Sequence, residues 1–130
     1  MKARYLLDTS VFSQPLRNRP VIRCLERWRD AGDAACRVCL VSIAEVEFGL
    51  HLEKRPERWK KYQTILEGRI EVLRTDTAVW SEFAKRKAQQ TLCGRAVSDL
   101  DLLIASCAIH HGLTVVTLNS KDFKKIDGLA

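Results

Sequence analysis

The chain has 130 residues, of which 46% are hydrophobic and 29% are charged. This length and composition are typical of one soluble globular domain spanning 1–130, and they exclude a disordered chain and a small disulfide scaffold. Lys and Arg outnumber Asp and Glu by 22 to 16, which gives a formal net charge of +6. That excess favours a polyanionic partner without requiring one.

No apolar run is long enough to cross a bilayer, and the first residues lead into a strand-like run without the features of a signal peptide. We therefore expect a cytoplasmic protein with no membrane partner. In that compartment the five cysteines are expected to be free thiols. Cys36 and Cys39 have the spacing of a zinc-binding pair, but no second pair accompanies them. We interpret them as small apolar residues of a strand.

Short apolar runs bounded by turn signals alternate along the chain with segments whose apolar residues recur at helical spacing. In chain order, these patterns predict a strand at 4–7, a helix at 20–30, a strand at 37–41, helices at 42–54 and 56–68, a strand at 70–73, helices at 76–93 and 98–111, and a strand at 113–117. Pro20 and Pro56 suit helix starts, Asp76 and Ser98 suit N-caps, and Gly112 suits a helix end.

Alternation of strands with helices predicts an α/β fold with a central parallel sheet of about four strands and helices on both faces. The sequence leaves open whether a short fifth strand follows position 128. In such sheets, functional groups collect beyond the carboxyl ends of the strands.

Four acidic residues fall at positions that this topology brings to the same edge of the sheet. Asp8 and Asp122 follow strands, Glu45 lies in the first turn of a helix after a strand, and Asp101 opens the apolar helix before the last strand. A carboxylate beside an apolar segment is costly to bury unless it is paired or bound to a metal.

Each acid also has a purely structural interpretation. These alternatives are helix capping boxes at Ser42-x-x-Glu45 and Ser98-x-x-Asp101, a turn at Asp8 and a solvated loop at Asp122. They do not explain why all four acids meet at one edge. Clustered carboxylates repel one another unless a cation compensates, and Mg²⁺ or Mn²⁺ is the usual cation. Such an ion activates water against phosphate esters, so the basic chain favours a nucleic-acid backbone as substrate.

The four acids lie within the motifs Tyr5-Leu6-Leu7-Asp8-Thr9-Ser10, Ser42-Ile43-Ala44-Glu45-Val46-Glu47-Phe48-Gly49, Asp101-Leu102-Leu103-Ile104-Ala105 and Val115-Val116-Thr117-Leu118-Asn119-Ser120-Lys121-Asp122-Phe123. In order and spacing, from about Arg4 to Leu129, these motifs resemble PIN-domain ribonucleases. The likeness is greatest to VapC-type toxins of bacterial toxin–antitoxin operons.

That resemblance implies a single PIN-like nuclease domain that is a Mg²⁺-dependent endoribonuclease, with Mn²⁺ as an alternative ion. It implies that Asp8, Glu45 and Asp101 bind the metal. Asp122 is the fourth catalytic acid by the same likeness, with Asn119 as the alternative, and Thr117 supports a ligand or water there. The resemblance also implies a structured RNA substrate such as transfer RNA, inhibition by a VapB-like antitoxin that covers the active site, and a toxin homodimer.

Two further acids compete with the predicted ligands. Asp99 precedes Asp101 by two residues, and Glu47 follows Glu45 by two. Side chains two residues apart on a helix point about 200° apart, so only one of each pair can face the site. We favour Asp101, which directly precedes the Leu-Leu-Ile-Ala run, and Glu45.

Basic residues near the predicted edge are candidates for RNA contacts. The candidates are Arg95 in the loop before the helix at 98–111, and Arg58 and Lys61, with Arg55 and Lys60, on the helix at 56–68, where Trp59 or Tyr62 would stack on bases. The alternative for that helix is a solvated charged face with aromatic residues in the core.

Two other functions compete with a ribonuclease. A Mg²⁺-dependent phosphatase or receiver-like domain also places acids at strand ends. However, a phosphatase of the haloacid-dehalogenase type needs a second Asp where this chain has Ser10, and a receiver needs an acidic neighbour that Asp8 lacks. A non-catalytic RNA-binding PIN module is the other alternative, and the presence of all four acids argues against it.

Overall fold

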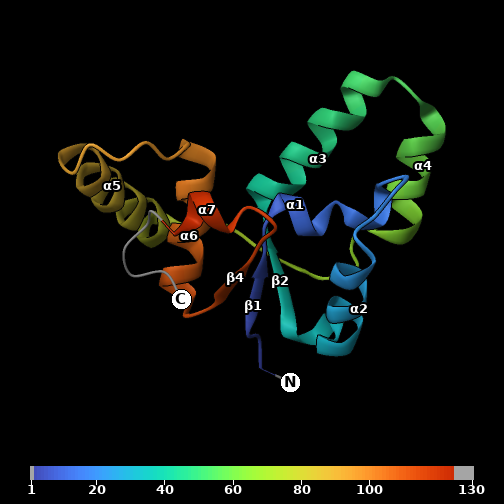
Figure 1. The fold of residues 1–130 in the computed structure, drawn as a ribbon, viewed down its shortest axis with the longest axis horizontal. Helices are drawn as coiled ribbons and strands as arrows, with labels where there is room; N and C mark the ends of the chain where they lie inside the picture. The colour runs from blue at the N-terminus through green and yellow to red at the C-terminus, as the bar shows by residue number, and fades with distance from the viewer. Residues whose placement is uncertain (1, 125–130) are drawn as a thin grey trace.

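The computed structural model describes residues 2–124, which form a four-stranded parallel sheet between layers of helices (Figure 1). The strands are β1 (Tyr5–Leu7), β2 (Cys36–Cys39), β3 (Glu71–Leu73) and β4 (Thr114–Val116). They lie in the order β3-β2-β1-β4, and each neighbouring pair is parallel. The predicted sheet is confirmed. A fifth strand after position 128 falls outside the described residues.

Seven α-helices and two 3₁₀ turns connect these strands within residues 2–124. They are α1 (Thr9–Phe12), η1 (Gln14–Leu16), α2 (Ile22–Ala31), η2 (Asp33–Ala35), α3 (Leu40–Glu53), α4 (Pro56–Ile65), α5 (Thr77–Leu92), α6 (Asp99–His111) and α7 (Ser120–Phe123). Within the same residues, no helix combines the length and the apolar character that a membrane span requires.

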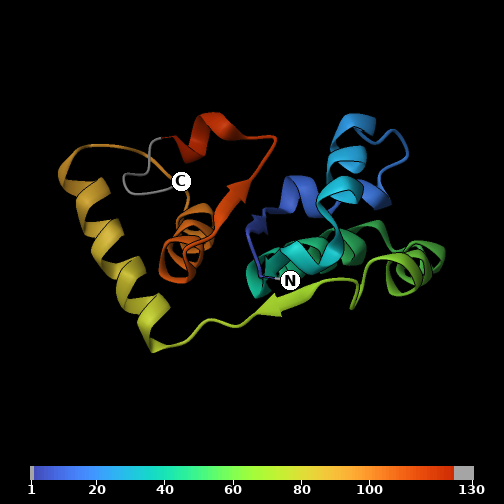
Figure 2. The same ribbon diagram turned by 90° about the horizontal axis from the view of Figure 1, so that it is seen from below.

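Two apolar cores lie on opposite faces of the sheet, because consecutive residues of a strand point to opposite sides. On β1, Leu6 packs into the core formed with α5, α6 and α7, and Leu7 packs into the core formed with α1 to α4. Figure 2 shows the two groups of helices on either side of the strands. Cys39 and Cys36 of β2 divide between the two cores in the same way. They therefore face apart and cannot share a zinc ion.

Local signals set several helix boundaries where the sequence predicts them. Asp76 caps α5, where its Oδ1 accepts from the Val79 amide at 3.0 Å, and Ser98 caps α6, where its Oγ accepts from the Asp101 amide at 3.2 Å. Gly112 ends α6 with φ at 67°, a left-handed conformation that glycine adopts without a steric cost.

The start of α3 differs from the prediction. We expected a strand to Val41 and a helix from Ser42, but β2 ends at Cys39 and α3 begins at Leu40. A continuous apolar run from Val38 to Val41 carries no polar cap that would mark the change from strand to helix. Ser42 is fully buried inside the first turn, so its interpretation as the first residue of a capping box is wrong.

The sequence does not predict α1 and α7, because a helix of four residues is too short to show a periodic apolar pattern. One consequence concerns Asp122. Contrary to the prediction, it does not follow β4 directly but lies within α7, which three residues (117–119) separate from the end of β4.

Candidate functional site

Asp8 lies where β1 ends and caps the N-terminus of α1. The residue is only 4% exposed, and its carboxylate accepts three hydrogen bonds. Oδ1 accepts from Ser10 Oγ at 2.6 Å and from the Val11 amide at 3.2 Å, and Oδ2 accepts from Thr117 Oγ1 at 2.5 Å. These contacts fix the orientation of the carboxylate and leave lone pairs on both oxygens for a further partner.

Two backbone amides orient the hydroxyl groups that contact Asp8. The Leu118 amide donates to Ser10 Oγ at 3.0 Å, and the Asn119 amide donates to Thr117 Oγ1 at 2.8 Å. Because each hydroxyl oxygen already accepts an N–H, its own proton is directed to Asp8. The loop after β4 therefore positions a carboxylate at the end of β1.

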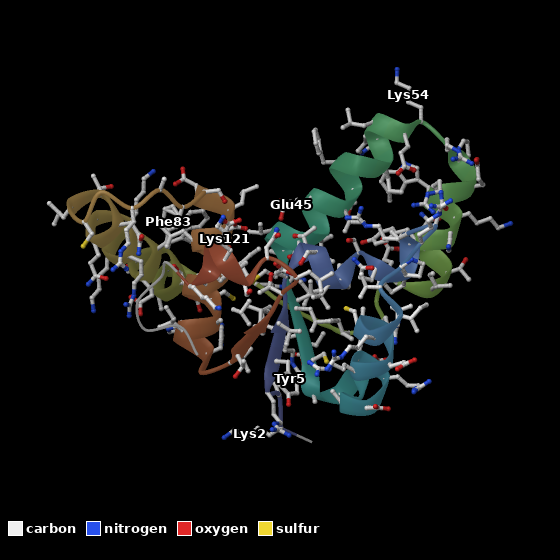
Figure 3. The ribbon with its side chains drawn as sticks, in the orientation of Figure 1. Lys2, Tyr5, Glu45, Lys54, Phe83 and Lys121 are labelled. Carbon is white, nitrogen blue, oxygen red and sulfur yellow. The ribbon has the colours of Figure 1, made fainter. Side chains whose placement is uncertain are left out.

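Glu45 lies in the second turn of α3, near the same edge of the sheet. Figure 3 shows it at the base of the helix, with Lys54 at the far end. Thr9 Oγ1 is 2.5 Å from Glu45 Oε1 and 3.0 Å from Ser42 Oγ, which is fully buried. Because Thr9 follows Asp8 in the chain, its contact with Glu45 links the segment that carries Asp8 to α3.

Asp101 lies in the first turn of α6. Burial raises the pKa of this carboxyl above its ordinary value, the hydrogen bond with Ser98 opposes that rise, and the charges of Asp122 and Asp8 add to it. Carboxylates from the end of β1, from α6 and from α7 are therefore near enough to repel one another. We call Asp8, Glu45, Asp101 and Asp122 the acidic site.

The two competing acids have partners elsewhere. Asp99 Oδ1 is 3.2 Å from Lys87 Nζ, and both side chains are mainly exposed. Glu47 acts on Tyr62 of α4: burial raises the pKa of the Tyr62 hydroxyl to about 12, and the charge of Glu47 contributes to that rise. The contacts of Asp99 and Glu47 thus lie away from the acidic site.

None of the ion pairs formed within residues 2–124 joins a Lys or Arg side chain to Asp8, Glu45, Asp101 or Asp122. Carboxylate oxygens are the ligands that Mg²⁺ and Mn²⁺ prefer. Over the same range, no three His, Cys, Asp or Glu side chains converge closely enough to enclose an ion. The donor set therefore fits an ion that keeps several waters and uses one or two carboxylates directly, as Mg²⁺ commonly does.

Comparison with known proteins agrees with this geometry. Residues 5–129 match the family model described as the PIN domain, which is nearly the whole chain. The chain belongs to the PIN-domain family.

Relatives of this PIN domain align over almost their full length. The tRNA(fMet)-specific endonuclease VapC of Shigella flexneri is 30% identical over 129 residues, with 97% of this chain and 94% of the relative covered. Ribonuclease VapC2 of Rickettsia felis is 26% identical over 125 residues, with 96% and 93% covered.

Solved structures of toxin–antitoxin complexes have the same fold. The DNA-bound VapBC of Salmonella typhimurium superposes with a TM-score of 0.82 at 27% identity, covering 98% of this chain and 95% of that one. VapBC2 of Rickettsia felis, bound to a fragment of promoter DNA, gives a TM-score of 0.85 at 23% identity, covering 99% and 96%. At that lower identity the second likeness is one of fold.

The predicted RNA contacts of this PIN domain lie in different places. Lys61 is exposed on α4, and Arg95 lies in the loop between α5 and α6. The Arg58 side chain is only 16% exposed, and its Nε is 3.1 Å from Glu53 Oε2. Arg58 is therefore held in one orientation, whereas Lys61 extends from the helix surface.

The aromatic residues of α4 do not form an exposed stacking surface. Tyr62 is fully buried, so its expected stacking on RNA bases is wrong. Trp59 is half-buried, with its ring centroid 4.9 Å from that of His51 and 6.3 Å from that of Tyr62. The alternative interpretation, aromatic residues in the core, describes this helix better.

Sequence patterns give no role to Thr9 and Ser10 beyond a turn, and they misplace Ser42 as a helix cap. In the structure Ser10 contacts Asp8, Thr9 contacts Glu45, and Ser42 contacts Thr9. The available signal was the pair of hydroxyl residues directly after an acid at a strand end. It is weak, because Ser and Thr are also common in ordinary turns.

Proposed function

We propose that this PIN domain is a divalent-metal-dependent endoribonuclease, the toxin of a VapBC-type toxin–antitoxin pair. The observation that carries the proposal is the buried Asp8 carboxylate, fixed by three hydrogen bonds beside other acids at the carboxyl edge of a parallel sheet. Likeness over nearly the full length to relatives named as RNA-cleaving enzymes supports the reaction class.

Among Asp8, Glu45 and Asp101, one or two carboxylates would coordinate Mg²⁺, or Mn²⁺ in its place, directly, and the others would bind it through its waters, with Asp122 as the fourth acid. A bound ion lowers the pKa of a water and neutralises charge on the phosphoryl oxygens. Asp122 suits the fourth position better than Asn119, because the charge of Asp122 acts on Asp101. The backbone amide of Asn119 donates to Thr117 Oγ1, which donates to Asp8, so Asn119 supports the first acid through its backbone.

Hydroxyl groups of the chain itself would keep these ligands in place. Ser10 and Thr117 hold the two oxygens of Asp8, and Thr9 holds Glu45. Partners of this kind fix the orientation of a ligand and typically change metal affinity or activity about 10- to 100-fold when they are lost. Fixed carboxylates also reduce the reorganisation that a transition state would otherwise require.

The partners follow from the relatives. One is named for cleavage of tRNA(fMet), and the similar complexes contain VapBC on DNA. We therefore assign structured RNA of the transfer RNA class as substrate and a VapB-like antitoxin as the inhibiting partner. A homodimer of the toxin is a separate part of the proposal, and the relatives' names do not bear on it. The net charge of +6 agrees with an RNA substrate.

A cleavage assay tests the proposal. Antitoxin-free protein is incubated with end-labelled total transfer RNA in Mg²⁺, in Mn²⁺ and in chelator. We expect discrete fragments with either ion and none with chelator. Asp8→Asn keeps the shape of the side chain and its capping oxygen, and it should slow cleavage about 100-fold or more while the protein remains folded. Wild-type rates in the folded variant would refute the assignment.

A further inference from the structure

A groove of about 440 Å³ leads away from the acidic site between α3 and the α1–η1 segment. Thr9 and Glu45, whose side chains are in contact, line the end at the acidic site. Arg17 follows η1 on one wall, and Arg58 lies beyond the far end of α3. The groove is therefore continuous with the predicted position of the reacting phosphate, and it carries guanidinium groups at its outer end.

The floor of the groove is apolar. Leu16, Val46 and Leu50 line it, and each is at most 7% exposed. Gly49 leaves the α3 wall open, because a Cβ atom at that position would meet no atom within 4 Å. Polar and charged side chains make up the rest of the lining, so one ligand can make both apolar and polar contacts in the groove.

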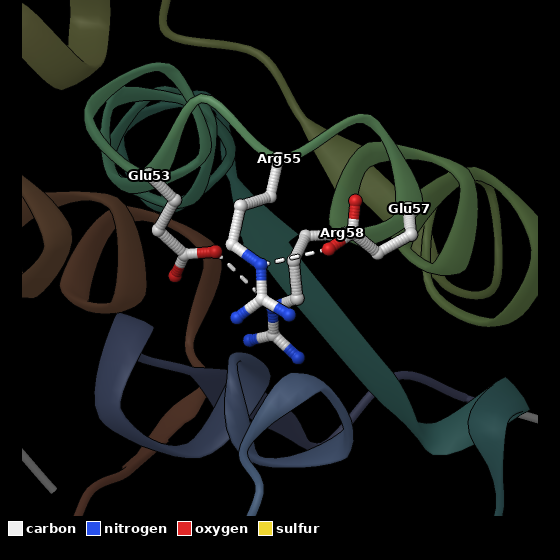
Figure 4. Close-up of polar contacts among 4 residues, drawn as sticks. All are labelled: Glu53, Arg55, Glu57 and Arg58. Carbon is white, nitrogen blue, oxygen red and sulfur yellow. Dashed lines mark hydrogen bonds and ion pairs between the residues drawn. The ribbon is translucent and has the colours of Figure 1, made fainter.

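The rim of the groove is polar. Figure 4 shows Arg58 held by Glu53, with Nε at 3.1 Å from Oε2, next to the separate Arg55–Glu57 pair. The ion pair engages Nε of Arg58, and the terminal nitrogens of the guanidinium carry its remaining donors. On the opposite wall, Arg17 Nη2 is 3.5 Å from Ser13 Oγ. Both guanidinium groups can therefore present N–H donors to a phosphate.

We propose that this groove binds a nucleotide of the RNA that adjoins the scissile phosphodiester. The base lies against the apolar floor at Gly49, and the next phosphate of the backbone lies between Arg17 and Arg58. Asn18, which also lines the groove, supplies an amide that can both donate to and accept from a base edge. This inference rests on the proposed function and adds a subsite to it.

An RNA segment explains the groove better than a protein segment for two reasons. The groove shares Glu45 with the acidic site and reaches Thr9, which follows Asp8, so a substrate held there would have its backbone directed into the site. The two guanidinium groups at the outer end suit a phosphate, which every nucleotide of an RNA supplies, whereas a peptide supplies a suitable anion only where it carries Asp or Glu. If a protein segment occupied the groove, the groove variants described next would bind RNA as wild type does.

Gly49→Leu fills the groove without a steric conflict elsewhere. Leu has a higher helix propensity than Gly, so the melting temperature should stay the same or rise. Affinity for fluorescein-labelled total transfer RNA is measured by anisotropy in chelator, where no cleavage occurs. We expect a loss of about tenfold, which is the order of one lost base contact. Ala88→Leu, at an exposed position of α5, is the control and should bind as wild type.

Arg58→Met tests the phosphate contact, with Glu53→Gln as its control. If Arg58 binds a phosphate, Arg58→Met should lower the slope of log Kd against log salt by about 0.7, the value for one single-strand phosphate. Glu53→Gln breaks the same ion pair but keeps the guanidinium, so it should bind RNA at least as tightly as wild type. An ion pair that is only structural would make the two variants equivalent in RNA binding.

The outcomes separate the subsite from the enzyme. If wild type cleaves RNA but Gly49→Leu and Arg58→Met bind and cleave like it, the subsite is overturned and the proposed function stands; the groove then serves a protein segment or no ligand. If Gly49→Leu weakens binding in chelator while Asp8→Asn binds normally and does not cleave, both proposals are supported. Failure of wild type to bind any transfer RNA overturns the subsite, and failure to cleave RNA overturns the proposed function.

Discussion

Hydroxyl groups hold Asp8 and Glu45 in place, and within residues 2–124 neither carboxylate forms an ion pair. Ser10 and Thr117 donate to Asp8, and Thr9 contacts Glu45. A hydroxyl orients a carboxylate without neutralising it, whereas Lys or Arg would compensate the charge that a metal needs. The arrangement therefore gives fixed geometry together with unneutralised negative charge, as a divalent-metal site requires.

Ser10→Ala tests this role at the scale of one residue. The variant loses the 2.6 Å bond to Asp8 and the acceptor of the Leu118 amide. We expect the apparent affinity for Mn²⁺ in the cleavage assay to fall about 10- to 100-fold. Denaturant unfolding should show a loss of only about 1 kcal/mol. Ser81→Ala, at an exposed position of α5, should change neither quantity.

Asp101→Asn tests the repulsion within the acidic site. The pKa of Asp101 is raised in the folded protein above its ordinary value of 3.8, first by burial and then by the charges of Asp122 and Asp8. A raised pKa means that the protonated carboxyl stabilises the folded protein relative to the unfolded chain. This stabilisation is complete below about pH 3.8 and is lost as the pH rises through the pKa of the folded protein. In chelator at neutral pH, Asp101→Asn should therefore melt at a higher temperature than wild type.

The same variant should lose cleavage in the presence of metal, because it removes a proposed ligand. Asp99→Asn is the matched control. Its carboxylate pairs with Lys87 on the surface, and exposed pairs contribute little, so the free energy of unfolding should change by less than about 0.5 kcal/mol. A melting temperature of Asp101→Asn below that of wild type at neutral pH would contradict the predicted repulsion.

The acids of the site can be predicted from the sequence, but their supports cannot. A charged residue beside an apolar run, as at Asp8 and Asp101, is costly enough to stand out in the sequence. Ser10 and Thr117 are compatible with ordinary turns, and only the pairing of β1 with β4 brings Thr117 to Asp8. The positions of hydroxyl protons depend on that tertiary arrangement, which periodicity does not encode.

Among the secondary-structure elements, those with a strong local signal are the ones that the sequence predicts correctly. Asp76 and Gly112 mark helix boundaries because their side chain or backbone conformation satisfies groups at a helix end. The boundary between β2 and α3 has no such signal, since apolar residues continue through Leu40 and Val41. The position of this boundary depends on tertiary packing, because Val38 is buried in the core on one face of the sheet and Val41 in the core on the other.

Tyr62→Phe tests the packing of α4 against the sheet. Tyr62 is fully buried, and among the described residues its hydroxyl has no hydrogen-bond partner. An unsatisfied buried group costs about 1–3 kcal/mol, so the variant should be more stable in denaturant unfolding by about 1 kcal/mol or more. Tyr5→Phe, on the half-buried β1 position, is the control and should differ from wild type by less than about 0.5 kcal/mol.

The pH dependence of Tyr62→Phe gives a second reading of the same contact. Burial, followed by the charges of Glu47 and Glu67, raises the pKa of Tyr62 to about 12 in the folded protein, above its ordinary value of 10.0. The neutral hydroxyl therefore stabilises the folded protein fully below pH 10.0, and this stabilisation is lost as the pH rises through about 12. Wild type should lose stability across that range more steeply than Tyr62→Phe does.

At the scale of the whole molecule, α3 begins between the two cores, with Val41 in one and Val46 in the other, and leaves one face exposed. It projects beyond the sheet with α4 beside it in Figure 1, and its inner residues Val46 and Leu50 are buried. Three large apolar side chains on its outer face are separated by eight and by four residues. Leu40 is 41% exposed, Phe48 is 64% exposed and Leu52 is 66% exposed. Residues at such intervals form one stripe along a helix, and an exposed apolar stripe is typical of a surface that binds another protein.

A second copy of the chain is the partner that the proposed homodimer requires, and the stripe of Leu40, Phe48 and Leu52 is a surface suited to it. Two such stripes can pack around a twofold axis, because each presents the same ridge to the other.

Phe48→Glu places a charge at the centre of that contact. It should convert a dimer to a monomer in sedimentation equilibrium and leave the thermal unfolding of the monomer unchanged, since the side chain is exposed. Leu92→Glu changes an even more exposed apolar residue, 87% exposed on α5, and should leave the dimer intact. A dimer that survives Phe48→Glu would place the interface on another face, and a monomeric wild type would remove the homodimer from the proposal.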